Sequence, residues 1–485
     1  MSGKQAPQNE SSSAHQPWAG RIPVKMIIEA RLVDDVTECP AVHLATIERE
    51  LTTDTLGLSL AEGKAILSSA QRYFVREQCR GIAWSHSCCE RCGIRLGRKG
   101  YHDRQIRTVF GRVVVRSARL RHCQCQGKKP GASFSPLLGL VPAAVTPELE
   151  YLQVKWAAHL SYAAAASMLA EVLPIADAIS VSSVKRRVRA VGSALDASAN
   201  TGHASDREPG VEPGALSALA VDSAWLRHCE PPRHQGRHVN LVAGRACFEG
   251  GHTRVYAYVH NQVSSAAGRL DEFLTASGVS PDARVTILTD GAGEFDKAAK
   301  GCKQPMCRIL DWFHIAMKFK AAERSVFGSK FIDSLEREGI EQQIQRAKWL
   351  VWHGKAGKAV ARLMELDQSL LARPAYEVGT LWWNLHGVAG YLRDNPSLVN
   401  YARRHHKGLP VSSSIAESAV NQVVSLRMAK KRQMRWSDEG AHLLAQVRVH
   451  DINGELKPRA VPLPLRPPRP THDPRWDAEL MREAA

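Results

Sequence analysis

The chain has 485 residues, of which 44% are hydrophobic, and it carries a formal net charge of +17 at pH 7. This length is enough for roughly three domains of about 100–200 residues. So large a positive charge is typical of proteins that bind nucleic acid, although a generally basic surface is the alternative. No apolar run reaches the ~18 residues of a membrane span, and residues 1–20 lack an apolar signal core, so we expect a cytoplasmic protein.

The N-terminal part contains two different compositions. Residues 1–20 are rich in Ser, Gln, Asn and Pro, which predicts disorder. Residues 21–83 are expected to be a helical region, because apolar residues recur at helical spacing through Leu44, Ile47 and Leu51.

Residues 84–135 contain two cysteine pairs on either side of a strand-rich stretch. Cys89 and Cys92 form a C-x-x-C pair, and Cys123 and Cys125 form a tighter C-x-C pair. Four thiolates on two knuckles joined by a β-hairpin are a ligand set for structural Zn²⁺, so we expect a zinc-ribbon-like module.

Other interpretations of this segment remain open. His86 and His122 are alternative ligands, and inert thiols are the alternative to a metal site. The basic residues between the pairs would face DNA: Arg104, Arg107, Arg112, Arg116, Arg119 and Arg121.

Residues 145–198 predict a helix-turn-helix-like DNA-binding domain. The first helix starts at Tyr162 and ends before Pro174, and Ser182 or Ser183 would cap the second. A basic second helix is suited to the major groove, although an ordinary helical hairpin with a solvated basic face is the alternative. Its basic residues are Lys185, Arg186, Arg187 and Arg189.

The second half of the chain predicts an α/β core with a helical insertion. Residues 199–216 have a linker composition, and residues 217–317 then alternate strand-like and helical segments, beginning with three strands in succession. Residues 318–405 are almost wholly helical in pattern, and 413–450 predict one or two more helices. Residues 456–485 form a proline-rich tail.

Three acids lie where this core could bring them together. Asp222 ends the segment LSALAVD, Asp290 ends RVTILTD, and Glu417 lies about one turn into a helix opened by SSSIAES. Carboxylates are the ligands that Mg²⁺ prefers, and two such ions can drive phosphodiester chemistry. An aspartate at a strand end is also a common turn former or helix cap. Competing candidates for the second position are Asp311, Glu294 and Asp296.

Four sequence words carry a resemblance to a known family: AVDSAW, ILTDGAGEF, LDWFHI and PVSSSIAESAVNQVVSLRMAKKRQMRWSDEGAHLLAQVRVHDINGEL. The chain resembles bacterial insertion-sequence DDE transposases of the ISKra group, in the Mutator-like superfamily, over roughly residues 40–460. The resemblance implies an RNase-H-like catalytic core formed by residues 217–317 and 406–455, with residues 318–405 as an all-helical insertion domain.

The resemblance also assigns the site residues. Asp222, Asp290 and Glu417 would hold two Mg²⁺ (or Mn²⁺) ions. The family's Asp-x-x-His motif is matched by Asp311 and His314. His314 would orient a water or the phosphate, and a histidine packed under the sheet edge is the alternative. Ser223 follows the first aspartate, where the family more often has Gly. Apart from the resemblance, basic residues follow Glu417 closely along the chain and would hold DNA phosphates, with a solvated charge run as the alternative: Arg427, Lys430, Lys431 and Arg432.

The implied function is DNA transposition. Such an enzyme binds the terminal repeats of its transposon, cleaves the DNA at the ends and joins the 3′-hydroxyl to target DNA. It would act on double-stranded DNA as a homodimer or higher oligomer, in a bacterial cytoplasm at the nucleoid. The alternatives are a transposase-derived DNA-binding regulator without catalysis, and a non-mobile nuclease with the same core.

Overall fold

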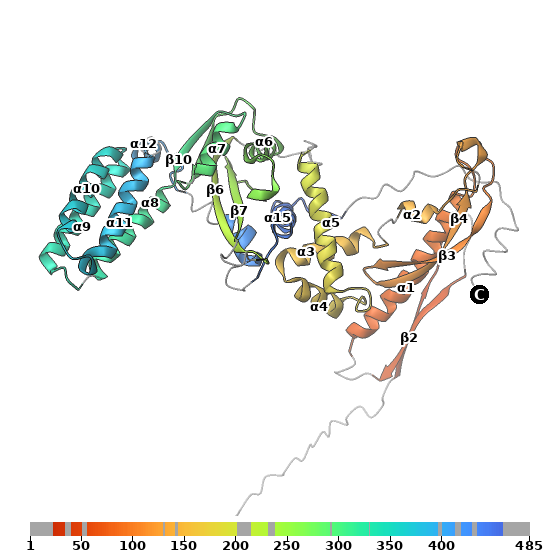
Figure 1. Ribbon diagram of the computed structural model, residues 1–485. Coiled ribbons are helices and arrows are strands. Elements are labelled where there is room, and N and C mark those ends of the chain that lie inside the picture. Colours follow the sequence, from red (N-terminus) through yellow and green to blue (C-terminus); the bar gives the residue numbers. More distant parts are fainter. Residues whose placement is uncertain are drawn as a thin grey trace, which may run out of the picture. The chain divides into compact units, whose positions relative to one another are not determined.

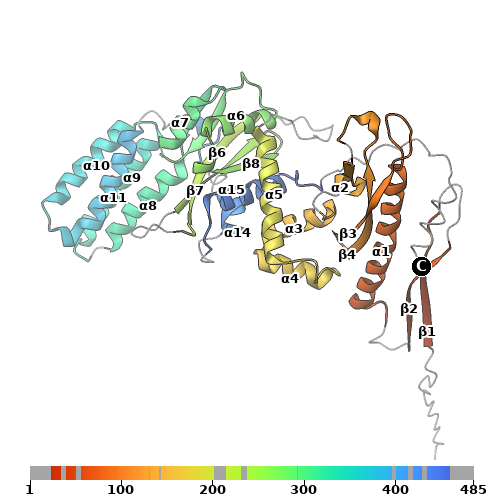
Figure 2. The same ribbon diagram turned by 45° about the vertical axis from the view of Figure 1, so that its right-hand side comes forward.

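The computed structural model describes residues 23–33, 40–50, 56–129, 131–140, 144–200, 215–230, 238–291, 293–328, 330–395, 400–412, 419–428 and 434–458. The chain forms two compact units. Unit 1 comprises Met1–Glu150, Ala166–Ile179 and Arg459–Ala485, and unit 2 comprises Tyr151–Ala165 and Ser180–Pro458. Figures 1 and 2 show the elements of both units. The expected disordered start, the middle of the linker and most of the proline-rich tail lie outside the described residues.

Unit 1 begins with a two-stranded antiparallel hairpin, β1 (Pro23–Ala30) and β2 (Val42–Glu50). The prediction of a helical region from residue 21 is therefore wrong in its first half. β-Branched residues such as Ile47 favour a strand, and pairing of Ile47 with Met26 decides the conformation. The helix α1 (Leu60–Ser85) starts only after this hairpin, with a reciprocal capping box between Ser59 and Glu62.

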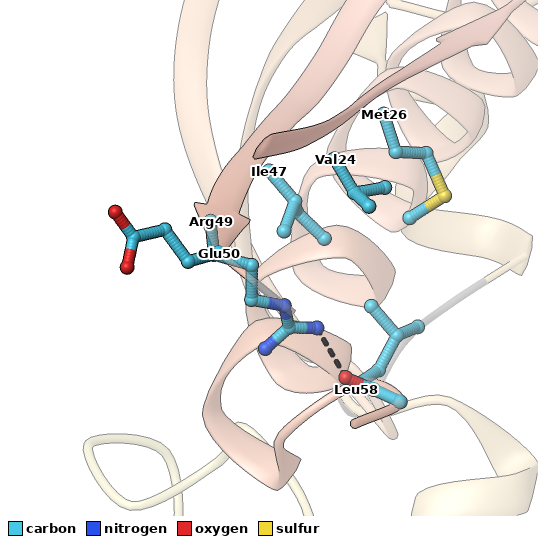
Figure 3. A pocket seen from close by; sticks show the side chains of 7 residues that line it. Val24, Met26, Ile47, Arg49, Glu50 and Leu58 are labelled. Carbon is cyan, nitrogen blue, oxygen red and sulfur yellow. Dashed lines mark hydrogen bonds between the residues drawn. The ribbon is translucent and has the colours of Figure 1, made fainter. Parts of the chain in front are cut away.

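A pocket of about 260 Å³ lies beside this hairpin (Figure 3). Its lining is mainly apolar, and Arg49 at one end donates a hydrogen bond to the carbonyl of Gly57. The lining residues are Val24, Met26, Ile47, Arg49, Glu50, Gly57 and Leu58. None of the residues expected to perform chemistry is among them.

A second sheet in unit 1 contains β3 (Arg98–Thr108), β4 (Gly111–Arg121) and the short β5 (Ser133–Phe134) in that order, all antiparallel. Alternate residues of β4 are buried, and Val113 and Val115 pack with Val75 of α1. The strand-rich character expected for residues 84–135 is confirmed. A short helix, α2 (Pro136–Leu140), follows.

Unit 2 is built on a five-stranded mixed sheet with the order β10-β9-β6-β7-β8. Strands β6 (Leu216–Arg227), β7 (His238–Phe248) and β8 (Thr253–Val259) form the expected antiparallel meander. Strands β9 (Val285–Thr289) and β10 (Met306–Leu310) run parallel to β6.

Helices cover the two faces of this sheet. On one face, α6 (Ala266–Ala276) and α7 (Gly293–Gly301) pack on a core that includes Leu219 and Val221 of β6. The opposite face, with Ala218 and Ala220, shares its core with a helical bundle (Figure 1). The helices of that bundle are α8 (Trp312–Gly328), α9 (Ser334–Trp352), α10 (Ala356–Leu371), α11 (Ala375–Asp394) and α12 (Tyr401–His406).

These helices agree with the helical pattern expected for residues 318–405. The first of them starts earlier than expected, because the segment CRILDWFHI is a strand only up to Leu310 and is helical from Trp312. Among the described helices, none is long and apolar enough to cross a membrane.

The remaining helices of unit 2 come from distant parts of the chain. The helix α3 (Pro147–His159) begins in unit 1 and continues into unit 2, α4 (Tyr162–Val172) begins in unit 2 and lies in unit 1 from Ala166, and α5 (Val181–Asn200) belongs to unit 2. The expected helix-turn-helix segment, residues 145–198, is therefore divided between the two units. Ser180, not Ser182 or Ser183, caps α5, because its hydroxyl accepts a hydrogen bond from the backbone N–H of Ser183.

The last described elements of unit 2 are a π-helical turn (Asn421–Ser425), α14 (Leu426–Met428) and α15 (Asp438–Ile452). The side chains of α15 and the following residue cover the outer edge of β8. His442 accepts a hydrogen bond from Val259 N–H, Gln446 donates to the carbonyl of Ala257, and Asn453 pairs with Val255. An edge strand that would otherwise be open is closed in this way.

Candidate active site

Three aspartates lie level with one another on adjacent parallel strands of unit 2. In the register of the sheet, Val221 of β6 faces Thr289 of β9, and Thr289 faces Leu310 of β10. The next residue on each strand is an aspartate: Asp222, Asp290 and Asp311. Neighbouring strands are about 4.8 Å apart, so this register places the three carboxylates at one edge of the sheet.

Alternation along the strands puts the aspartates on the same face. Asp222 follows Ala220 by two residues and Asp290 follows Leu288 by two, and both of these apolar residues pack against the helical bundle. The site therefore lies on the bundle side of the sheet.

Asp222 does not end its strand, which corrects the expectation from the sequence. β6 continues to Arg227, because β7 pairs with it along that whole length. Only the parallel neighbour β9 ends at Thr289, so the β9 side of β6 has no ladder partner beyond Val221. Asp222 therefore marks the end of the parallel ladder.

Asp311 is fully buried, and its carboxylate is engaged within the protein. One oxygen accepts a hydrogen bond from the backbone N–H of Phe313 in the first turn of α8, and the other lies 2.6 Å from Nδ1 of His314. Asp311 thus caps α8 and orients the imidazole. The side chains of the other competing candidates, Glu294 and Asp296, lie outside the described residues.

The local electrostatics couple these groups. Burial raises the pKa of Asp222, and the nearby carboxylates of Asp290 and Asp311 raise it further, against the hydrogen bond from Ser223 N–H and the charge of His314. The hydrogen bond to Asp311 raises the pKa of His314 against the effect of burial, and the surrounding carboxylates add to the rise. A bound cation would stabilise the ionised form of carboxylates that lie this close together.

Glu417 lies outside the described residues, but the helix that follows it is described. Arg245 of β7 donates a hydrogen bond to the side chain of Gln422 in the π-helical turn. Arg245 pairs with Ala220 across the sheet, so its side chain points to the face that carries Asp222. The segment five residues after Glu417 is therefore held on the face of the aspartates. Single π-turns of this kind are frequent at functional sites.

Two buried arginines hold this segment in place. Arg448 of α15 donates to the carbonyls of Gln422 and Val423 in the π-turn and of Ala158 at the end of α3. Arg427 is only 1% exposed, donates to the carbonyl of Ala157 and lies over the rings of Tyr162 and Trp436. The expectation that Arg427 holds DNA phosphates is therefore wrong, because helix packing removes its side chain from the surface.

The other predicted DNA-binding residues have different outcomes. Lys185 and Arg186 are exposed on α5, and Arg187 is half-buried. Arg189 forms a 3.0 Å ion pair with Glu439 of α15. The residues Lys430, Lys431 and Arg432 lie outside the described residues.

The four predicted zinc ligands come together in unit 1. The Sγ atoms of Cys89 and Cys125 are 3.4 Å apart, and those of Cys92 are 3.5 Å from both Cys123 and Cys125. All four sulfurs lie within 4.8 Å of one another. A tetrahedral Zn²⁺ with bonds of about 2.3 Å places its sulfurs about 3.8 Å apart, so the donor set fits this ion.

The environment of this cluster favours deprotonation of one thiol, that of Cys89, and opposes that of its neighbours. Backbone N–H groups of Arg91 and Cys92 lower the pKa of Cys89 to about 7, whereas the neighbouring thiols raise the pKa of Cys125. A bound cation would offset the repulsion between neighbouring thiolates. Across the described parts of the chain, this is the one group of three or more metal-ligand side chains that converges so closely.

The alternative ligands of this cluster have other partners. His86 contacts the carbonyl of Ile82 through Nδ1 at 2.9 Å, and His122 contacts the side chain of Gln126 at 3.0 Å.

A row of exposed arginines runs along β4. Alternation in β4 exposes the side chains of Arg112, Arg116, Arg119 and Arg121. Arg104 is buried, which corrects the expectation that it would face DNA. The sequence pattern did not single out Tyr101 of β3. Its ring belongs to the same surface, because Arg98 and Arg116 both lie over it.

No family model matches this chain, and no curated protein matches it in sequence. Among solved structures, the Drosophila P element transposase strand transfer complex is similar over 64% of this chain and 93% of that chain, at 10% identity and a TM-score of 0.31. At this TM-score the similarity enters no argument about the fold or the activity of the chain.

Proposed function

We propose that this chain is a metal-dependent DDE transposase of the ISKra group, with an RNase-H-like core in unit 2. The observation that carries the proposal is the level arrangement of Asp222, Asp290 and Asp311 on β6, β9 and β10. In the sheet, β6, β7 and β8 form an antiparallel meander, and the parallel strands β9 and β10 lie on the other side of β6. This is the strand order of an RNase-H-like sheet. The long word around Glu417 supports the specific family.

Asp222 and Asp290 would hold divalent metal, with Glu417 as the third ligand. The raised pKa of Asp222 beside other carboxylates is the property that a cation would reverse. The position of the π-helical turn on the same face supports an approach of Glu417 to the aspartates. When bound, two Mg²⁺ or Mn²⁺ ions supply an activated water and relieve charge on the phosphate.

The remaining residues of the site prepare its geometry. Asp311 holds the imidazole of His314 by Nδ1, which keeps the ring oriented and favours its protonated form. A cationic His314 beside two carboxylates is suited to donate a hydrogen bond to a phosphate oxygen. His314 would thereby align the scissile group relative to Asp222 and Asp290.

The proposed DNA contacts are divided between the two units. In unit 1 the exposed arginines of β4 would bind backbone phosphates beside a zinc-stabilised ribbon, and in unit 2 Lys185 and Arg186 would do so. We propose that the chain binds transposon ends through these surfaces, cleaves there and joins the 3′-hydroxyl to target DNA as a dimer or higher oligomer.

The test is cleavage of DNA that carries the ends of the element, with purified protein and Mg²⁺. Asp222→Asn, Asp290→Asn and Glu417→Gln should each abolish cleavage while they leave end binding intact. Asp282→Asn is the matched control, because Asp282 is an exposed aspartate just before β9, at the opposite end of the strand from Asp290. Cleavage at the parent rate in all three site variants would refute the assignment. End binding without any cleavage by the parent would favour a regulator without catalysis.

A further inference from the structure

The peptide group that follows Asp290 is held at both of its ends. Its carbonyl oxygen accepts hydrogen bonds from Arg308 Nη2 at 2.9 Å and from the hydroxyl of Thr289 at 2.8 Å. Its N–H, which belongs to Gly291, donates to the hydroxyl of Tyr391 at 3.0 Å. The plane of this peptide is therefore fixed by β10 on one side and by α11 on the other.

Tyr391 also explains the glycine at position 291. A Cβ atom at this position would lie 2.5 Å from Cε2 of the Tyr391 ring, closer than real carbon atoms approach. The ring thus rests directly against the turn that leaves β9, and only Gly leaves room for it.

The tyrosine is itself rigidly placed. Neighbouring residues of α11, Val388, Ala389 and Leu392, are buried in the core shared by the sheet and the helical bundle. The ammonium group of Lys318 lies 4.6 Å from the centre of the Tyr391 ring, and Asn395 donates to the backbone carbonyl of Tyr391. The hydroxyl therefore has little freedom to follow a moving turn.

We infer that Tyr391 is a positioning residue that sets the orientation of the Asp290 carboxylate for metal binding. The inference rests on the proposed function, in which Asp290 is a metal ligand. A peptide plane fixed on both sides restricts ψ of Asp290, and this restriction limits the directions that its side chain can take. The helical bundle, through α11, is in this way part of the metal site.

Tyr391→Phe removes the hydroxyl and keeps the ring, so the packing against Gly291 is retained. Binding of Mn²⁺ to the intact protein, measured by titration calorimetry or by electron paramagnetic resonance without DNA, should weaken about two- to tenfold, the range expected for one lost hydrogen bond. Tyr376→Phe is the matched control, because Tyr376 lies on the same helix and is 75% exposed. This control should bind Mn²⁺ as the parent does.

The Mg²⁺ concentration for half-maximal cleavage should rise by the same factor in Tyr391→Phe. The cleavage rate at saturating Mg²⁺ should change little, since the hydroxyl is bonded to the backbone of Gly291 and acts through Asp290. In a Gly291→Ala background, where the new Cβ pushes the ring away, Tyr391→Phe should have almost no further effect.

The outcomes separate the two proposals. If Asp290→Asn weakens Mn²⁺ binding but Tyr391→Phe binds as tightly as Tyr376→Phe, the role of Tyr391 is refuted and the metal site stands. If the parent and Asp290→Asn bind Mn²⁺ equally, the proposed metal site fails, and the role of Tyr391 fails with it.

Discussion

Gly192 in α5 tests whether this helix is a packed element of unit 2 or an independent recognition helix. A Cβ atom at Gly192 would lie 2.5 Å from the backbone carbonyl oxygen of Leu443 in α15. Because the obstacle is backbone, the two helices would have to separate by about 1 Å, which forfeits a quarter to a half of the dispersion energy along their contact.

Two effects of Gly192→Ala oppose each other. Alanine stabilises a helix interior by about 1 kcal/mol relative to glycine, whereas overpacking at a tight contact costs about 1–3 kcal/mol. Val188 and Val191, next to Gly192 on α5, are also buried, so a separation of the helix from its neighbours would cost contacts there too. We therefore expect a net destabilisation of up to about 2 kcal/mol.

The assay is urea unfolding followed by circular dichroism, with Gly339→Ala as the matched control. Gly339 lies in the interior of α9 with no atom within 4 Å of its would-be Cβ, so alanine there should stabilise the protein by up to about 1 kcal/mol. The two substitutions should move the midpoint in opposite directions. A stabilising effect of Gly192→Ala equal to that of Gly339→Ala would refute the packing of α5 on α15.

The remaining predictions concern stability and metal content. Burial lowers the pKa of His442 to about 4 from 6.5, so the unfolded chain gains a proton first, and the free energy of unfolding should fall as pH drops from 6.5 to 4. The fall should be smaller in His442→Gln, and the same pH dependence in the parent and the variant would contradict this prediction. Arg427→Lys keeps the charge but loses the donor to Ala157, so it should lower the free energy of unfolding by about 1–3 kcal/mol, whereas a phosphate-binding arginine would tolerate Lys without loss of stability. Cys89→Ser should lower the zinc content of the purified protein, measured by mass spectrometry of the bound metal. One zinc ion per chain in both the parent and the variant would exclude the cysteine site.

Local patterns predicted those elements whose partners are close in the sequence. The three strands of the meander and the helices of residues 318–405 follow from alternation and helical periodicity. The cysteine pairs met as their spacing indicated, because the β-hairpin between them fixes the distance from one knuckle to the other.

The errors arose where a distant segment decides the outcome. β2 is a strand because β1 pairs with it, and Asp222 lies within β6 because β7 extends the strand beyond its parallel partner. Arg427 belongs to a basic stretch of the sequence, but it is buried against α3, which lies some 270 residues away along the chain. No local pattern could have identified Tyr391, since its role depends on a contact with Gly291 across 100 residues.

The closure of the β8 edge by α15 has a consequence for synthesis of the protein. The partners of Val255, Ala257 and Val259 come from residues 442–453, near the end of the described chain. When the whole meander has left the ribosome, the residues that form hydrogen bonds with its outer strand, β8, have not yet been synthesised. Until then this strand is an open template for pairing with other nascent chains, so products that stop before Asp438 should aggregate. Only a chain translated through α15 can complete the sheet that carries the aspartates.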